Sequence, residues 1–219
     1  QRGVIAVLDV GTSKIGCLIL KFEGSEEKID RDGVGSLAGQ SGFQVIGSAL
    51  TKSRGIEYGE IVSMPETERA IRTALQSAQK LANSRVDHVI ACISGGSPRS
   101  YGLEGNVNIK SEIVDDRDIA DVLGSCGIPA YEPDREILHA QPVNFSLDHR
   151  TGLSDPRGQI GKNLSVDMHM LTIKEKTIQD LAYCIKRCDL ELAGVASSSY
   201  VSALSSLVED EKELGAACI

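Results

Sequence analysis

Short apolar runs at the amino end of the chain predict β-strands. Two runs rich in Val, Ile and Leu, at residues 4–8 and 15–22, flank a short polar stretch. Such a pair of β-rich runs, joined by a turn of Gly, Thr and Ser, is typical of a hairpin. A third run at residues 44–50 predicts a third strand, and the Gly-, Ser- and charge-rich residues 23–42 predict a long mobile loop before it.

Apolar residues at helical spacing predict four helices further along the chain. These helices are expected to begin near Ser63, Asp115, Lys176 and Ala196 and to end near Asn83, Gly127, Cys188 and Val208. At the first start, a Ser, a Pro in the first turn and a Glu three residues after the Ser predict a capping box. The face of this helix expected to be buried consists of Ala70, Ile71, Ala74, Leu75, Ala78, Leu81 and Ala82. The last helix is expected to bury Tyr200, Leu204, Leu207 and Val208.

The remaining β-rich runs complete the outline of the fold. Further strands are expected at residues 86–93, 106–109, 137–147, 165–173 and 190–195. This order of strands and helices is typical of an α/β or α+β fold with a mixed sheet. Between about residues 95 and 164, Gly and Pro punctuate short elements, which predicts a small α+β domain inserted into the first one.

Both ends of the chain point to a longer protein. Residue 1 is Gln rather than an initiator Met, and residues 215–219 have the composition of a starting strand. A strand needs partners to be stable, so we expect the chain to be the amino-terminal part of a longer protein.

Composition narrows the classes of function. The chain has 23 Lys and Arg against 31 Asp and Glu, a net charge of −8, and no basic patch. Affinity for nucleic acid comes largely from neutralised phosphates, so we expect no nucleic acid partner. No apolar run approaches the roughly 20 residues that span a bilayer, and we expect a cytoplasmic protein. The six Cys lack the spacing of a metal site, so we expect free thiols.

The turn between the first two strands carries the chemistry of the sequence. Gly11 permits positive φ and lets a phosphate approach the backbone closely. Successive N–H groups in such a turn form an anion nest, to which Thr12 and Ser13 add hydroxyl donors. Lys14 supplies a positive charge for phosphate, and Asp9 is placed to hold Mg²⁺ through water. The alternative is a hairpin turn without a ligand, because the same residue types favour turns.

The amino-terminal hairpin and several later segments carry a resemblance to a known family. Residues 4–14 resemble the first phosphate-binding hairpin of the actin, Hsp70 and sugar-kinase superfamily. Further segments resemble the bacterial FtsA family, and they occur in the family's order. They are Ser53–Ile61, Val89–Gly95, Arg135–Pro142, Asp155–Gly161 with Val166–His169, and Glu209–Gly215. Because the series runs over nearly the whole chain, it is more specific than any single motif.

The resemblance implies a particular domain layout. Residues 1–94 with 165–205 would form an actin-like (ribonuclease H-like) subdomain 1A. Residues 95–164 would form an inserted strand-helix-strand-strand subdomain 1C, the SHS2 domain. Residues 206–219 would begin subdomain 2A.

The resemblance also implies a role in cell division and septum formation. Members of the family bind ATP with Mg²⁺, polymerise, and link the FtsZ ring to the cytoplasmic face of the inner membrane at the division septum. By that likeness the residues that bind ATP would be Asp9, Gly11, Thr12, Ser13 and Lys14, with Asp9 also serving Mg²⁺. Residues 95–164 would take part in self-association and recruit later divisome proteins. The second half of the ATP site, the parts that contact FtsZ and the amphipathic membrane helix are expected after residue 219.

Two features limit the expected activity. Hydrolysing relatives place Gln or Glu at the start of the connecting helix, where this chain has Ala196-Ser197-Ser198-Ser199. Phosphoryl transfer depends on positioning the attacking water, so the resemblance implies ATP binding with weak or absent hydrolysis and no catalytic residue. Because half of the site is expected beyond this chain, residues 1–219 alone are expected to bind ATP weakly or not at all.

Two alternatives stay open on the sequence alone, since a fold does not fix a function. One is a pure binding module similar to the pilus-assembly protein PilM. The other is a small-molecule kinase of the same superfold, in which Asp148 of Asp148-His149-Arg150 would act as the base. A solvated turn after a strand explains these three residues without any catalytic role.

Overall fold

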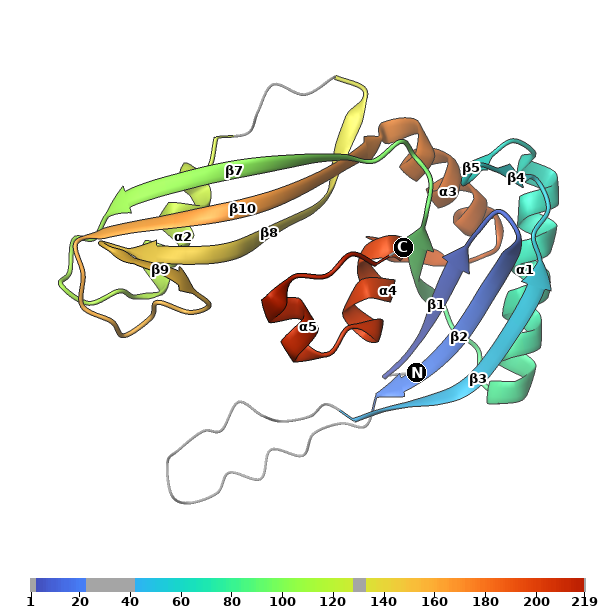
Figure 1. Ribbon diagram of the computed structural model, residues 1–219. Helices are drawn as coiled ribbons and strands as arrows, with labels where there is room; N and C mark the ends of the chain where they lie inside the picture. The colour runs from blue at the N-terminus through green and yellow to red at the C-terminus, as the bar shows by residue number, and fades with distance from the viewer. Residues whose placement is uncertain (1–2, 23–41, 128–132, 219) are drawn as a thin grey trace, which may run out of the picture. The chain divides into compact units, whose positions relative to one another are not determined.

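The computed structural model describes residues 3–22, 42–127 and 133–218. The loop expected at residues 23–42 lies outside these ranges, apart from Gly42. The chain divides into two compact units (Figure 1): Gln1–Gly96 with Thr177–Ile219, and Ser97–Lys176. Each unit has a sheet of its own.

The first unit is built on a five-stranded mixed sheet in the order β11-β6-β1-β2-β3. The strands are β1 (Val4–Val10), β2 (Lys14–Phe22), β3 (Phe43–Lys52), β6 (His88–Ile93) and β11 (Glu191–Ser197). β1 runs parallel to β6, and β6 runs parallel to β11, whereas β2 pairs antiparallel with both β1 and β3. The hairpin and the third strand predicted from the sequence are therefore confirmed.

Alternation along the hairpin places one face of this sheet in the core. The fully or almost fully buried side chains of β1 and β2 are Ala6, Leu8, Val10, Ile15, Cys17 and Ile19. α1 (Met64–Ala82) packs against β2 and β3 (Figure 1). At Gly47 of β3 an added Cβ would lie only 2.4 Å from the carbonyl oxygen of Ala78, so glycine lets the helix approach the sheet closely.

The expectations for α1 are confirmed for most of its length and wrong at its two ends. Thr67 and the predicted apolar residues as far as Ala78 are buried, but Leu81 is 69% exposed. In the last turn Ala82, not Leu81, packs over Gly47. Ser63 makes no capping hydrogen bond through its side chain, so the predicted capping box is also wrong.

The rest of the first unit consists of short elements. These are β4 (Ile56–Glu57), β5 (Glu60–Ile61), α3 (Glu175–Arg187), which begins at the end of the second unit, α4 (Ser198–Ser206) and α5 (Glu209–Leu214). The expected buried face of the last predicted helix is wrong: α4 buries no residue, and Leu204 is 48% exposed. Residues 215–218 form no strand, and Ile219 lies outside the described residues. The described part of the chain holds no helix long and apolar enough to cross a membrane.

The second unit is an antiparallel sheet with one helix on it. The strand order is β7-β10-β8-β9, from β7 (Arg99–Asn108), β8 (Arg135–Leu147), β9 (Arg150–Leu153) and β10 (Asn163–Lys174). α2 (Asp116–Ser125) packs on one face of this sheet. The core that they share consists of Val114, Ile119, Val122, Cys126, Phe145, Leu147, Leu164 and Val166. Along the chain this is strand, helix, strand and strand, with the short β9 added.

The cap of α2 was predicted correctly. The Asp115 carboxylate accepts hydrogen bonds from the N–H groups of Arg117 and Asp118, at 2.8 and 3.1 Å. The Asp118 side chain in turn accepts from the Asp115 N–H, which completes a capping box. The helix ends at Ser125, and Cys126 is its C-cap, one residue before the predicted stop at Gly127.

The strand predicted at residues 165–173 exists, but it does not return to the main sheet. β10 pairs with β7 from Asn163↔Asn108 to Thr172↔Arg99, and with β8 on its other side. The predicted boundary at residue 164 is therefore wrong, because it would cut through the middle of one sheet. The α/β class, with a strand-helix-strand-strand unit inserted after β6, is confirmed.

Candidate nucleotide-binding site

The predicted site residues lie at one edge of the first sheet. β1, β6 and β11 are parallel, so their carboxyl ends meet at the same edge. Polar segments follow all three strands there: the Gly11–Lys14 turn after β1, Ser94–Gly96 after β6 and Ser197–Ser199 at the end of β11. In open α/β sheets ligands bind outside the carboxyl ends of the strands. The fold thus brings Asp9 and the Gly11–Lys14 turn together at the edge where a ligand is expected.

The Gly11–Lys14 turn is tight and open to solvent. The Gly11 N–H donates to the Lys14 carbonyl oxygen at 3.1 Å, and the side chains of Thr12, Ser13 and Lys14 are exposed. Gly11 does not adopt the positive φ that glycine permits. An added Cβ would lie 3.1 Å from the Lys14 carbonyl oxygen, so glycine serves the close turn itself.

Asp9 has an exposed carboxylate at the end of the central strand β1. Its Oδ1 accepts a hydrogen bond from Ser198 Oγ at 3.1 Å. Within the described residues its second oxygen accepts no hydrogen bond, which leaves an oxygen of the type that Mg²⁺ and its waters prefer. In the neighbouring strand, burial and then the negative charge of Asp9 raise the pKa of the Cys92 thiol.

The end of β11 is polar but carries no group able to activate water strongly. Ser197 precedes α4, and its hydroxyl lies 2.8 Å from that of Ser199. Ser198 is engaged with Asp9. The arrangement supplies hydroxyls and helix N–H groups, and Ser197–Ser199 contains no carboxylate or carboxamide side chain that could orient an attacking water.

Two glycines that the sequence analysis assigned no role complete this edge. The N–H of Gly59, in the turn between β4 and β5, donates to Thr12 Oγ1 at 2.9 Å. Gly59 packs directly on Gly95, in the loop after β6. The glycine at the end of this two-residue turn is a local signal for the hairpin, because glycine adopts the positive φ that such a turn requires. No local signal joins Gly59 to Thr12, because the two residues lie 47 positions apart.

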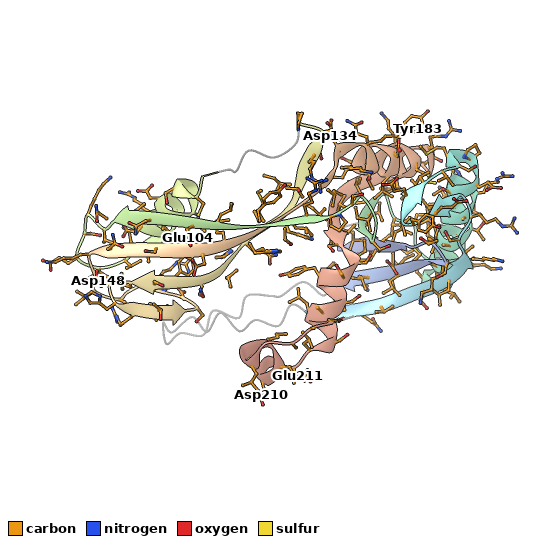
Figure 2. All side chains as sticks on the ribbon, turned by 45° about the horizontal axis from the view of Figure 1, so that its top comes forward. Glu104, Asp134, Asp148, Tyr183, Asp210 and Glu211 are labelled. Carbon is orange, nitrogen blue, oxygen red and sulfur yellow. The ribbon has the colours of Figure 1, made fainter. Side chains whose placement is uncertain are left out.

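Asp148 lies in the second unit, at the turn between β8 and β9 (Figure 2). Its φ is 55°, and its carboxylate accepts hydrogen bonds from the N–H groups of Lys162 and Asn163. The bond from Asn163, followed by that from Lys162, lowers the pKa of Asp148. A lowered pKa makes a weak base, so these contacts favour the structural turn over the catalytic role considered above.

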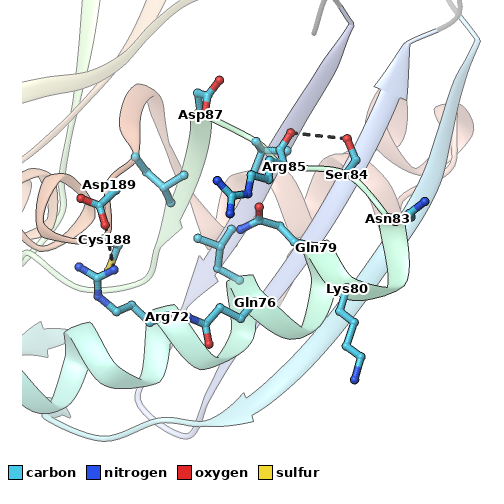
Figure 3. Close-up of a pocket in the computed structure, with 13 residues that line it drawn as sticks. Arg72, Gln76, Gln79, Lys80, Asn83, Ser84, Arg85, Asp87, Cys188 and Asp189 are labelled. Atoms are coloured by element: carbon cyan, nitrogen blue, oxygen red, sulfur yellow. Dashed lines mark hydrogen bonds and ion pairs between the residues drawn. The ribbon is translucent and has the colours of Figure 1, made fainter.

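A hollow of the first unit lies at the opposite edge of the sheet from Asp9 (Figure 3). It has a volume of about 830 Å³ and is lined by the last turns of α1 and by the residues before β6 and β11. Arg72, Lys80, Arg85 and Asp87 are among the lining residues. Because β6 and β11 begin at this edge, the hollow is separate from the site around Asp9.

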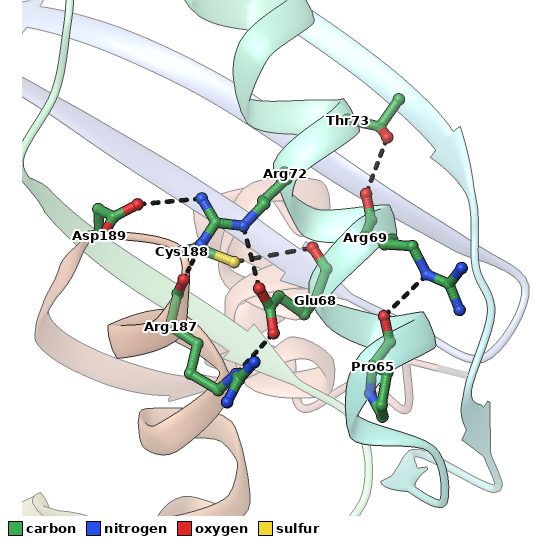
Figure 4. Close-up of polar contacts among 8 residues, drawn as sticks. All are labelled: Pro65, Glu68, Arg69, Arg72, Thr73, Arg187, Cys188 and Asp189. Carbon is green, nitrogen blue, oxygen red and sulfur yellow. Dashed lines mark hydrogen bonds and ion pairs between the residues drawn. The ribbon is translucent and has the colours of Figure 1, made fainter.

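A cluster of ion pairs beside this hollow ties α1 to the end of α3 (Figure 4). Glu68 accepts from Arg72 Nε at 3.1 Å and from Arg187 Nε at 2.6 Å, and Arg72 also donates to Asp189 at 3.0 Å. The bond from Arg187, followed by that from Arg72, lowers the pKa of Glu68. Each charge is matched within the cluster, which fits a structural role.

Comparison with known proteins identifies the inserted unit and relates the whole chain to a family. The family model described as "SHS2 domain inserted in FTSA" matches residues 95–172. The chain is 34% identical to "Cell division protein FtsA" of Rhizobium meliloti over 99% of this chain and 48% of the relative. It is 31% identical to the protein of the same name in Pseudomonas aeruginosa, over 98% of this chain and 48% of the relative.

A solved structure agrees with this fold. The "PilM-PilN type IV pilus biogenesis complex" superposes with a TM-score of 0.55 and 10% sequence identity, over 90% of this chain and 48% of that chain. At this identity the likeness concerns the fold alone. The fold thus defines an α/β protein that carries an inserted SHS2 domain. More particularly, the chain is similar to FtsA proteins along nearly its whole length, and it spans about half the length of the curated relatives that it matches.

Proposed function

We propose that this chain supplies one side of an ATP·Mg²⁺ site in an actin-like protein of bacterial cell division. The observation that carries the proposal is the place of the Gly11–Lys14 turn. It lies at the carboxyl edge of three parallel strands, with the exposed Asp9 carboxylate near the end of β1, the central strand of the five-stranded sheet. A tight turn of exposed N–H, hydroxyl and ammonium groups at that edge suits the phosphates of a nucleotide.

Each residue of the turn has a distinct part in this proposal. The N–H and hydroxyl groups of Thr12 and Ser13 donate to phosphate oxygens, and Gly11 keeps the turn tight. Lys14 adds a positive charge, which binds phosphate as a point charge. Asp9 holds Mg²⁺ through water, with Ser198 fixing one carboxylate oxygen and the other left open. Bound Mg²⁺ would neutralise the phosphate charges that face this edge.

The cellular role follows from the family relationship. The two relatives are both named as cell division proteins. We propose that the full-length protein polymerises, links the FtsZ ring to the cytoplasmic face of the inner membrane at the septum, and recruits later divisome proteins through the SHS2 domain. The serines at the start of α4 support slow or absent hydrolysis, so ATP would act as a switch for assembly. A PilM-like role has less support, because that likeness concerns the fold alone.

Calorimetry on the full-length protein tests the ATP site. Lys14→Ala removes the positive charge of the turn, and we expect ATP·Mg²⁺ affinity to fall by roughly tenfold, as for loss of a hydrogen bond to a charged group. Lys21→Ala is the matched control, because Lys21 is an exposed lysine at the other end of the same strand, β2. Equal affinity of Lys14→Ala and the unchanged protein would contradict the proposal. Residues 1–219 alone are expected to bind weakly or not at all.

A further inference from the structure

The turn between β4 and β5 approaches the Gly11–Lys14 turn from outside the amino-terminal hairpin. It consists of Tyr58 and Gly59, which both adopt positive φ, of 52° and 75°. Two central residues at positive φ are typical of a type I′ turn. Tyr58 is 95% exposed, so burial of its ring does not hold the turn in place. The contacts that hold it are made by Gly59.

The N–H of Gly59 determines which way the Thr12 hydroxyl can donate. Gly59 N lies 2.9 Å from Thr12 Oγ1 and donates to it. A hydroxyl that accepts a hydrogen bond from one side directs its own proton elsewhere. Because the Thr12 side chain is exposed, that proton is free to meet a ligand at the edge of the sheet. The contact therefore prepares Thr12 as a donor, which is the role that a phosphate oxygen requires.

Gly59 is held against this hydroxyl by a second backbone. A Cβ on Gly59 would lie 2.6 Å from the Cα of Gly95, and a Cβ on Gly95 would lie 2.2 Å from the Gly59 carbonyl oxygen. Neither position has room for a side chain. Gly95 follows β6, the strand beside β1, so the tip of the β4–β5 hairpin contacts the loops after both strands.

The base of the β4–β5 hairpin is fixed to α1. The hydroxyl of the fully buried Thr67 lies 3.0 Å from the carbonyl oxygens of both Gly55 and Ser63. On the other side of the Gly11–Lys14 turn, the Ser53 N–H donates to the Ser13 carbonyl oxygen at 3.1 Å. Ser53 Oγ is buried and has no hydrogen-bond partner within the described residues. The segment from Ser53 to Ser63 therefore contacts the Gly11–Lys14 turn at two residues, through Ser53 at Ser13 and through Gly59 at Thr12.

We infer that Gly59 is a positioning residue of the nucleotide site, which acts by holding the Thr12 hydroxyl as a donor toward phosphate. The inference rests on the proposed ATP site and adds a segment that no local motif connects to it. Gly59 itself touches no nucleotide. Its effect on ATP therefore passes through Thr12, and this makes the inference separable from a general loss of structure.

A double-mutant cycle on the full-length protein tests this coupling. Thr12→Val removes the hydroxyl, and Gly59→Ala displaces the hairpin tip, because the added Cβ meets Gly95. We expect each change to weaken ATP·Mg²⁺ binding by roughly tenfold, as for one hydrogen bond to a charged group. The double variant is expected to bind no more weakly than the weaker single variant. Additive losses, roughly a hundredfold in all, would overturn the inference, as would unchanged binding by Gly59→Ala.

The control for the glycine change is Gly158→Ala. Gly158 has the same φ of 75° as Gly59, but a Cβ there meets nothing within 4 Å. Its substitution introduces the same backbone strain without the clash, and we expect unchanged ATP affinity. If Gly59→Ala fails to fold, hydrogen exchange of the Gly59 amide replaces it. Exchange is expected to quicken in Thr12→Val and to match the unchanged protein in Thr12→Ser; equal exchange in all three overturns the inference.

The outcomes also separate this inference from the proposed function. If the unchanged protein binds no ATP, both the proposed ATP site and the role of Gly59 are rejected. A protein that binds ATP and loses affinity in Lys14→Ala, but shows additive losses in the cycle, would keep the ATP site and reject the role of Gly59.

Discussion

Leu147 is expected to be a main source of stability in the second unit. Its side chain is fully buried on β8, opposite Leu164 of β10. Leu147→Ala removes three carbons, which at about 0.8 kcal/mol for each buried methylene loses roughly 2.4 kcal/mol of transfer free energy. A residual cavity of about 60 Å³, at about 24 cal/mol per Å³, adds roughly 1.5 kcal/mol. We expect the free energy of unfolding of this unit to fall by about 4 kcal/mol.

Gly161 offers a second test of the same contact. A Cβ at this position would lie 2.5 Å from Leu147 Cδ1 and 2.6 Å from its Cγ. In the unchanged protein Gly161→Ala should therefore cost about 1–3 kcal/mol by overpacking. In Leu147→Ala the clashing atoms are gone, so the same change is expected to be nearly neutral or to restore stability by filling part of the cavity.

Urea unfolding, monitored by hydrogen exchange and mass spectrometry, measures the free energy of unfolding of these variants. Peptides from residues 97–176 report on the second unit separately from the rest of the chain. Val143→Ala is the control, because Val143 lies on the same strand but is 66% exposed. A loss from Leu147→Ala below about 1 kcal/mol, or no greater than that of the control, would refute the packing argument. So would an equal cost of Gly161→Ala in both backgrounds.

Two further predictions concern the first unit. Gly47→Ala places a Cβ 2.4 Å from the Ala78 carbonyl oxygen and should lower the free energy of unfolding by about 1–3 kcal/mol. Gly194→Ala is the control in the same sheet, because a Cβ there meets nothing within 4 Å, and it should lower the free energy of unfolding far less. Equal loss of thermal stability in the two variants would contradict the close packing of α1. Because hydrogen bonds from arginines lower the pKa of Glu68, its contribution to stability is present above the ordinary value near 4.5 and is lost as the pH falls through the lowered value. Glu68→Gln should therefore flatten the acid side of the pH–stability curve, while Glu57→Gln should leave it unchanged, and identical curves for the two variants would be evidence against the ion-pair cluster.

The sequence predicted those elements whose periodicity is strong and whose partners are close. The hairpin β1–β2 and the buried face of α1 follow directly from period-2 and helical patterns. β7 was recognised only at its end, because Gly102 and Gly105 weaken the β signal of a strand whose alternate residues face solvent. Its full length is set by pairing with β10, about 60 residues away, and a local pattern does not contain that information.

The candidate site was predictable in part for the same reason. Asp9 and the Gly11–Lys14 turn form one continuous motif, so their nearness to one another is encoded locally. Gly59 and Ser198 reach this motif only through the fold, across 47 and 189 positions. The wrong prediction that Leu204 is buried has a related cause. A helical pattern shows which face is apolar, but only tertiary structure shows whether that face is covered.

The position of the triphosphate is the most direct test of the nucleotide site, and a crystal structure of the full-length protein with ATP and Mg²⁺ measures it. We predict that phosphate oxygens accept hydrogen bonds from the backbone and hydroxyls of Thr12 and Ser13, that Lys14 lies beside them, and that Asp9 contacts a water on Mg²⁺. Phosphates bound elsewhere, for example in the hollow lined by Arg72 and Lys80, with an empty Gly11–Lys14 turn, would contradict the account.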